Sequence, residues 1–104
     1  TGSPGDGTII STVTESIMNV VDYGMNIQQS ISAPRLHHQW YPQSVSIESG
    51  LLTPESKQKL EAMGHSFEIH QAIGADEAIM IDPATGQRQG ASDPRRPAGM
   101  AAGL

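Results

Sequence analysis

The chain has 104 residues, of which 37% are hydrophobic and 4% aromatic, enough for one domain with few large core side chains. Its formal net charge of −5 argues against nucleic acid as a partner, because phosphate binding requires clustered Lys and Arg. It contains no cysteine, so it forms neither a disulfide nor a thiolate metal site. No apolar run approaches the roughly 20 residues of a membrane span. We therefore expect a single domain over residues 1–104 with no membrane span and no nucleic-acid partner.

The first seven residues, TGSPGDG, form a loop that leads into helical sequence. Three glycines and one proline in this stretch exclude a helix or a central strand. A loop that enters a helix N-terminus points several unpaired N–H groups and the positive end of the helix dipole at one place. Such a junction can hold a phosphate, a carboxylate or the oxyanion of an acyl-transfer intermediate. A plain turn before a capped helix is the simpler alternative, and a nucleotide-phosphate loop is disfavoured because its lysine is missing.

Two helices are predicted in the next part of the chain. Residues 8–23 carry apolar side chains at three- and four-residue steps, which predicts one buried stripe. A short helix over residues 27–32 is predicted by Asn26 and Gln29, which form a capping box. Pro34 stops this helix. The expected stripe of the first helix consists of Ile9, Ile10, Val13, Ile17, Val20 and Val21.

Residues 35–40, RLHHQW, have the most unusual composition. The adjacent His37 and His38 suggest a metal, but neighbours in an extended segment point to opposite faces, and zinc needs three or four converging ligands. We therefore expect no metal site. Arg35, both histidines and Trp40 are expected to pack and hydrogen-bond beneath neighbouring elements. No residue pattern indicates a cofactor.

The rest of the chain alternates strands with one helix. Thr53 and Pro54 mark the start of that helix, which is predicted to run to Met63 with Leu60 and Met63 facing inward. Alternating or apolar runs predict strands over residues 44–48, 65–70, 78–82 and 87–91, the last two joined by a hairpin turn. The fold class is therefore α/β (α+β), with two longer helices, one short helix and four to five mostly antiparallel strands.

Four blocks of this sequence resemble the C-terminal part of the small subunit of γ-glutamyltranspeptidase. They are GSPG at residues 2–5, YGMN at 23–26, APRLHHQW at 33–40 and GASDPR at 90–95. The blocks follow the family's order along essentially the whole chain, and the last two are each specific. The resemblance implies that the chain is a fragment of an N-terminal nucleophile hydrolase, an αββα sandwich.

The resemblance also implies an activity. In this family a precursor cleaves itself, and the small subunit then begins with a threonine that attacks the γ-glutamyl amide of glutathione and similar substrates. The γ-glutamyl group passes to water or to an amino acid or peptide. The implied partners are the remainder of the small subunit and the large subunit, and the implied compartment of the parent enzyme is periplasmic or extracellular. A glutaryl-cephalosporin or poly-γ-glutamate acylase, or an inactive structural or binding module, is the alternative.

The resemblance assigns the candidate site residues to the glycine-rich loop. The family's oxyanion hole consists of the backbone N–H groups of two adjacent glycines, which correspond here to Gly5 and Asp6. Asp6 retains the N–H, and its side chain is expected to cap the following helix. Thr1 corresponds to the position before Gly-Ser-Pro and is not the nucleophile. The chain alone should therefore be inactive, and its uncovered apolar faces should make it self-associate.

Overall fold

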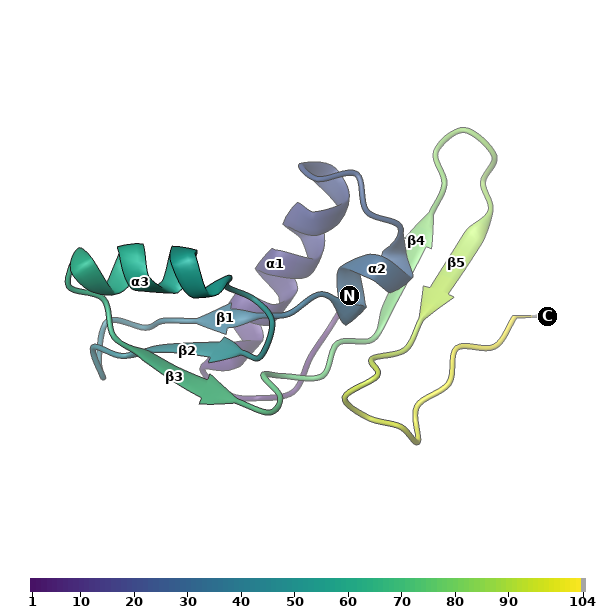
Figure 1. Ribbon diagram of the computed structural model, residues 1–104. Helices are drawn as coiled ribbons and strands as arrows, with labels where there is room; N and C mark the ends of the chain where they lie inside the picture. The colour runs from purple at the N-terminus through teal and green to yellow at the C-terminus, as the bar shows by residue number, and fades with distance from the viewer. Residues whose placement is uncertain (104) are drawn as a thin grey trace.

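The computed structural model describes residues 1–103, which form three helices and five short strands in two separate sheets (Figure 1). The helices are α1 (Thr8–Val21), α2 (Ile27–Ser32) and α3 (Pro54–Ala62). The strands are β1 (Leu36–His37), β2 (Val45–Glu48), β3 (Phe67–His70), β4 (Ala78–Ile81) and β5 (Arg88–Ala91). The α/β class and the number of elements agree with the sequence prediction. No helix within these residues is long and apolar enough to cross a membrane.

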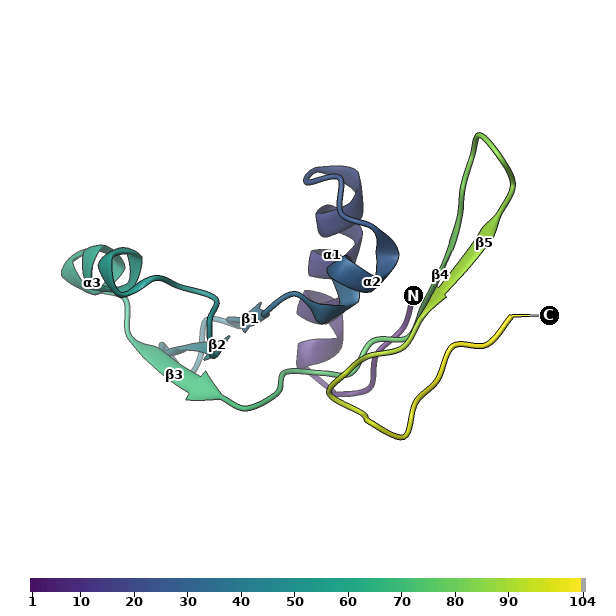
Figure 2. The same cartoon turned by 45° about the vertical axis from the view of Figure 1, so that its right-hand side comes forward.

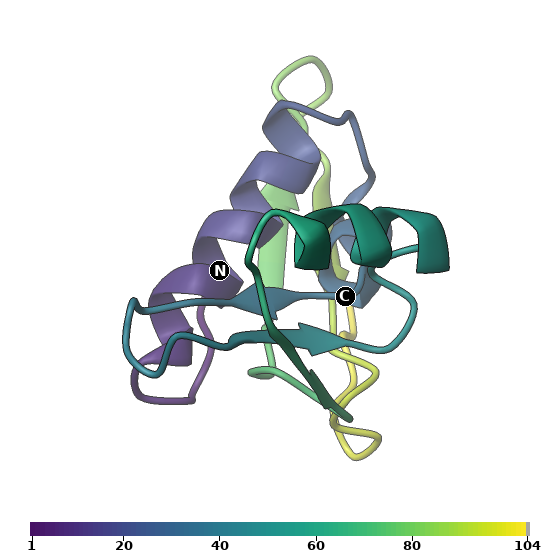
Figure 3. The ribbon, with the colours of Figure 1, turned by 60° about the vertical axis from the view of Figure 1, so that its left-hand side comes forward.

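The two sheets lie at opposite sides of the α1–α2 pair (Figure 2). One sheet has the order β1-β2-β3, with β1 antiparallel to β2 and β2 parallel to β3 across the α3 connection. The other is the antiparallel β4–β5 hairpin, which packs against α2. Figure 3 views the molecule from the end that carries the three-stranded sheet and α3. The pairing is therefore mixed, because a helical crossover between β2 and β3 brings them together in parallel.

Local signals in the sequence set the helix ends. The Asn26 side chain accepts a hydrogen bond from the Gln29 N–H at 2.8 Å, and the Gln29 side chain accepts one from the Asn26 N–H at 3.0 Å. Both arms of the predicted capping box are therefore present. Thr53 likewise caps α3, with Pro54 in the first turn. Helix α1 ends at Val21, two residues before the predicted end.

The apolar core is small. Its main cluster is Ile31, Ala78 and Ala91, with Ile27 packed against them, and Ile47, Ile73 and Ala75 are buried as well. The predicted burial of the α1 stripe is wrong, because the residues that α1 buries are the polar Thr12 and Ser16. Most of the stripe lies on the outside, with Ile10 76% exposed and Val21 74% exposed. Val13 and Val20 are half-buried.

The orientation predicted for α3 is also wrong in part. Met63, expected to face inward, follows the helix and is 75% exposed. Leu60 is half-buried, and α3 has no fully buried residue. Since α3 lies at one end of the molecule (Figure 2), its apolar side chains have little surface to pack against.

Candidate functional site

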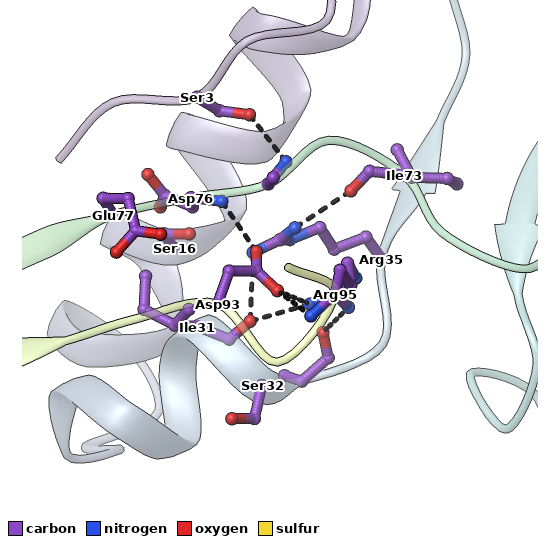
Figure 4. A network of polar contacts seen from close by, with 12 residues as sticks. Ser3, Ser16, Ile31, Ser32, Arg35, Ile73, Asp76, Glu77, Asp93 and Arg95 are labelled. Carbon is purple, nitrogen blue, oxygen red and sulfur yellow. Dashed lines mark hydrogen bonds and ion pairs between the residues drawn. The ribbon is translucent and has the colours of Figure 1, made fainter. Parts of the chain in front are cut away.

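The start of the glycine-rich loop is fixed to the segment that precedes β4. Gly2 and Glu77 exchange backbone hydrogen bonds of 3.1 and 3.0 Å, which form an isolated antiparallel bridge. The Ser3 hydroxyl accepts a hydrogen bond of 3.0 Å from the Ala75 N–H (Figure 4). These contacts join residues more than 70 positions apart, so the loop is held by the tertiary fold and not only by its own turn.

The tip of the loop turns sharply into α1. Gly5 has φ 134° and Asp6 has φ 54°, both in the left-handed region. The Gly5 carbonyl accepts hydrogen bonds from the Thr8 N–H at 3.1 Å and the Thr8 hydroxyl at 2.7 Å, and the Asp6 carbonyl accepts one from the Ile9 N–H at 3.2 Å. A Cβ at Gly5 would lie only 2.2 Å from the Thr8 hydroxyl oxygen, so a side chain does not fit there.

The turn directs both carbonyls of the loop tip toward the helix. Within residues 1–103, neither the Gly5 nor the Asp6 N–H donates a hydrogen bond, and both residues are exposed. N–H groups of exposed residues next to a helix N-terminus are available to donate to an anion. An open pocket of about 260 Å³ adjoins the loop between Gly5, Gly74 and Arg96. That the junction at Gly5 and Asp6 faces an anion stays a prediction.

The predicted helix cap at Asp6 is wrong. The residue that precedes α1 is Gly7, with φ −59° and ψ −26°, and no side chain makes a capping hydrogen bond there. A capping side chain normally comes from an N-cap residue with extended backbone angles, whereas Asp6 is left-handed and lies one residue too early. Asp6 therefore contributes its backbone to this turn, and its carboxylate is left at the surface.

The Thr1 hydroxyl is bound by a carboxylate. Its Oγ1 lies 2.6 Å from both oxygens of Asp76, and the Gly2 N–H donates to the same carboxylate at 3.0 Å. Asp76 is fully buried, and its own N–H donates to Asp93 at 2.6 Å. Thr1 thus belongs to the hydrogen-bonded support of the loop.

Four charged side chains form a connected set of ion pairs that we call the charge cluster: Arg35, Glu48, Asp93 and Arg95. Figure 4 shows three of them, Arg35, Asp93 and Arg95. Arg35 forms an ion pair with Asp93 at 2.8 Å. Arg95 bridges Asp93, at 3.0 Å, and Glu48, whose Oε1 it meets at 2.5 Å through its Nε. Two positive and two negative charges therefore neutralise one another in the interior.

Backbone groups complete the hydrogen bonding of the charge cluster. Arg35 donates to the Ile73 and Ile31 carbonyls, and Arg95 to the Ile31 and Ala33 carbonyls. Glu48 accepts the N–H groups of Arg35 and Ile73 at 2.9 and 2.6 Å. The charge cluster therefore joins β2, the C-terminal end of α2 and the segments on either side of the β4–β5 hairpin.

The electrostatics of the charge cluster favour its ionised form. Burial by itself raises the pKa of Glu48, but hydrogen bonds from Arg95 and from the Ile73 and Arg35 N–H groups outweigh it and lower that pKa. Asp93 follows the same pattern, since burial is outweighed by bonds from the Arg95 and Asp76 N–H groups and from both guanidiniums. The two carboxylates raise the pKa of Arg95 against the opposing effect of burial.

The expectation for residues 35–40 holds for some side chains only. Arg35 is buried, and His37 is half-buried with its Nδ1 2.8 Å from the Ser11 hydroxyl of α1. His38 and Trp40 were expected to pack inward, but both are exposed, Trp40 to 83%. The two histidines thus differ in burial, as alternate positions of an extended segment do. Within the described part of the chain, no three His, Asp or Glu side chains gather as metal ligands would.

The charge cluster was missed in the sequence. Arg35 and Arg95 lie within the blocks 33–40 and 90–95, but the spacing gives no sign that they share two carboxylates. Glu48 looked like the last residue of a half-buried strand, where an acid is usually solvated. Only the fold brings together residues up to 60 positions apart.

Comparison with known proteins matches all the described residues to one protein family. The sequence model of the family described as Gamma-glutamyltranspeptidase matches residues 1–103. A glutathione hydrolase proenzyme of Escherichia coli is 43% identical over 95 residues, which are 91% of this chain and 16% of that protein. One from a Pseudomonas species is 38% identical over 98% of this chain and 19% of its own length. The chain thus spans less than a fifth of these curated relatives.

The fold is also found in a solved structure. The crystal structure of a gamma-glutamyltranspeptidase inhibited by acivicin superposes with a TM-score of 0.86 at 40% identity, covering 91% of this chain and 52% of that chain. Most of the fold described above therefore occurs within a chain about twice as long.

Proposed function

The chain belongs to the γ-glutamyltranspeptidase family, and we propose that it forms the C-terminal part of the small subunit of such an enzyme. The enzyme would cleave the γ-glutamyl amide of glutathione and transfer the γ-glutamyl group to water or to an amino acid or peptide. The similarity to proteins named glutathione hydrolases supports this substrate. The two sheets and their helices would then be part of an αββα sandwich.

The observation that carries the proposal is the geometry of the loop tip. When a nucleophile attacks an amide carbonyl, negative charge develops on its oxygen, and preorganised N–H donors stabilise that charge. The N–H groups of Gly5 and Asp6 are consecutive, exposed and without a partner in residues 1–103. Their positions are fixed by the bridge at Gly2 and by the first turn of α1. We assign these two N–H groups to the oxyanion hole.

The threonine nucleophile would come from a part of the protein outside this chain. Thr1 is a poor candidate, because its hydroxyl is already held by the buried Asp76 carboxylate in the support of the loop. The isolated chain would therefore hydrolyse no γ-glutamyl amide. The remainder of the small subunit and the large subunit would cover the outward apolar side chains of α1 and β4.

Substitutions at the loop tip in the complete enzyme test this function. Gly5→Val should lower turnover of γ-glutamyl-4-nitroanilide about a hundredfold, because it distorts the N–H donors where no Cβ fits. Asp6→Asn should keep most of the activity, since asparagine accepts a positive φ and retains the N–H. Asp6→Gly should be equally active or faster, because it removes a negative charge beside the developing oxyanion.

The proposal has a clear counter-result. If Asp6→Asn abolished turnover while the circular dichroism spectrum stayed unchanged, the carboxylate itself would be catalytic. Full activity in a folded Gly5→Val enzyme would likewise refute the assignment of the oxyanion hole.

A further inference from the structure

We propose that His37 and Gln39 are positioning residues that hold the Gly5–Asp6 loop tip against α1. This inference rests on the proposed role of the loop and assigns a task to two residues of the segment 35–40. The segment combines two adjacent histidines with a glutamine, and the structure uses only one of the histidines in the interior.

The Gln39 amide is oriented by its neighbours. Its Nε2 donates to the Tyr41 carbonyl at 3.2 Å, so its Oε1 points the other way. Oε1 lies 3.0 Å from His37 Nε2. It also occupies the space beside Gly7, where a Cβ would lie 2.7 Å from it. The amide oxygen is therefore placed between the imidazole ring and the loop residue that directly follows Asp6.

This arrangement determines the tautomer of His37. An amide oxygen only accepts hydrogen bonds, so His37 Nε2 must carry the proton that it donates to Gln39. In the neutral ring, Nδ1 is then an acceptor, and it receives the Ser11 hydroxyl at 2.8 Å. Ser11 lies in α1, one turn beyond the residues that close the loop. A single imidazole thus connects α1 to the amide whose oxygen lies beside Gly7.

The other contacts of the loop hold its beginning and its entry into α1, not the side that faces Gln39. The bridge at Gly2 and the Ser3 hydroxyl hold its beginning, and the Thr8 and Ile9 bonds define its entry into α1. The Ser11–His37–Gln39 chain, which we call the brace, adds support from β1 and the residues after it. The brace contains no group that touches the proposed oxyanion directly. Its loss would shift the N–H donors without removing a substrate contact.

The test uses the complete enzyme with His37→Ala, Gln39→Met and the control His38→Ala. His38 is the exposed neighbour of His37, so the control removes the same ring from the same segment without touching the brace. A displacement of an ångström or less in a catalytic donor costs about tenfold to a hundredfold in rate. We expect kcat for γ-glutamyl-4-nitroanilide to fall about tenfold in both brace variants, with KM unchanged and His38→Ala as active as the wild type.

A second readout separates positioning from a loss of stability. A boronic acid analogue of the γ-glutamyl group forms a tetrahedral adduct with the nucleophile, so its affinity should weaken by the same factor as kcat. His37→Gln should recover part of the activity that His37→Ala loses, because its amide can still donate to Gln39.

The possible outcomes are distinct. Wild-type kcat in folded His37→Ala and Gln39→Met enzymes, an equal loss in His38→Ala, or an effect on thermal unfolding alone would overturn the brace and leave the proposed function intact. Gln39 is exposed, so Gln39→Met should fold and tests the brace even if His37→Ala does not fold. A wild-type enzyme without γ-glutamyl turnover would instead refute the proposed function.

Discussion

The charge cluster and the outer apolar faces of this chain reverse the usual distribution of residues. The interior junction holds two arginines and two carboxylates, whereas Ile10, Ile17, Val21, Ile79 and Ile81 are more than half exposed. In most proteins, arginine and acidic side chains are rarely buried unless they are paired. Here pairing is complete, and the large apolar side chains are left outside. The charge cluster therefore fixes the relative positions of β2, α2 and the β4–β5 hairpin. The exposed apolar faces are typical of surfaces that bind another protein surface.

The largest expected effect comes from breaking the charge cluster. Arg95→Met leaves Glu48 without its guanidinium and Asp93 with only one of two, so the free energy of unfolding should fall by about 3–5 kcal/mol. Arg88→Met, at an exposed position in β5, should change it by less than about 0.5 kcal/mol. Urea denaturation at low protein concentration measures both. Equal stabilities for the two variants would show that the charge cluster does not hold the fold together.

The apolar faces should produce a smaller effect, on association. The chain alone should form dimers or larger species, because Ile79 and Ile81 project from the same face of β4 and are exposed. Replacing both with serine should weaken association by about 2 kcal/mol or more, since burial of each side chain contributes a similar amount. Light scattering over a range of concentrations measures this, with Ala84→Ser in the hairpin turn as the control. A chain that stays monomeric at high concentration would contradict the prediction.

The smallest expected effect is on the pH dependence of stability, and it separates the fully bonded carboxylates of the charge cluster from Glu15, which has one oxygen without a partner in the described chain. Glu15 in α1 accepts the Leu36 N–H with one oxygen, while its other oxygen is buried without a partner in the described chain. Burial therefore raises its pKa, despite the opposing Leu36 bond. Glu48 and Asp93 have lowered pKa values instead. The two kinds of acid should respond to pH in opposite directions.

The signs follow from proton linkage. The folded state binds a proton at Glu15 before the unfolded state does, so this group adds stability as pH falls through its raised pKa. Glu48 and Asp93 contribute stability above their unfolded values of about 4, and it is lost as pH falls below that through their folded values. Glu15→Gln should thus raise the free energy of unfolding slightly at pH 7, by up to about 0.5 kcal/mol. The variant should also lack the increase in stability that Glu15 gives the wild type on mild acidification. Thermal unfolding between pH 7 and 3 measures this; a destabilised Glu15→Gln variant would contradict it.

Short-range chemistry was readable from the sequence. The capping box of Asn26 and the Thr53-Pro54 helix start depend on neighbours three residues apart, and the structure contains both. The hairpin between β4 and β5 follows from its turn residues in the same way. The glycine-rich loop was recognised as a junction that leads into a helix, because only glycine readily adopts the angles found at Gly5.

Contacts between residues far apart in the sequence could not be predicted from it. The periodicity of α1 predicted an apolar stripe correctly but not its partner, and within this chain the helix turns Thr12 and Ser16 inward. The sign of φ at Asp6 could not be seen in its residue type, so the predicted cap was wrong. The meeting of Arg35 with Asp93 depends on the path of the intervening 57 residues, which no local pattern encodes.

The carboxylates of the charge cluster have a consequence for amide hydrogen exchange. Glu48 accepts the N–H groups of Arg35 and Ile73, and Asp93 accepts that of Asp76, although none of the three donors belongs to a strand or helix. These donors are buried and bound to anions, so they exchange only when the cluster opens. Protection in this molecule therefore extends into its loops, and the slowest loop amides report on the integrity of a set of side chains.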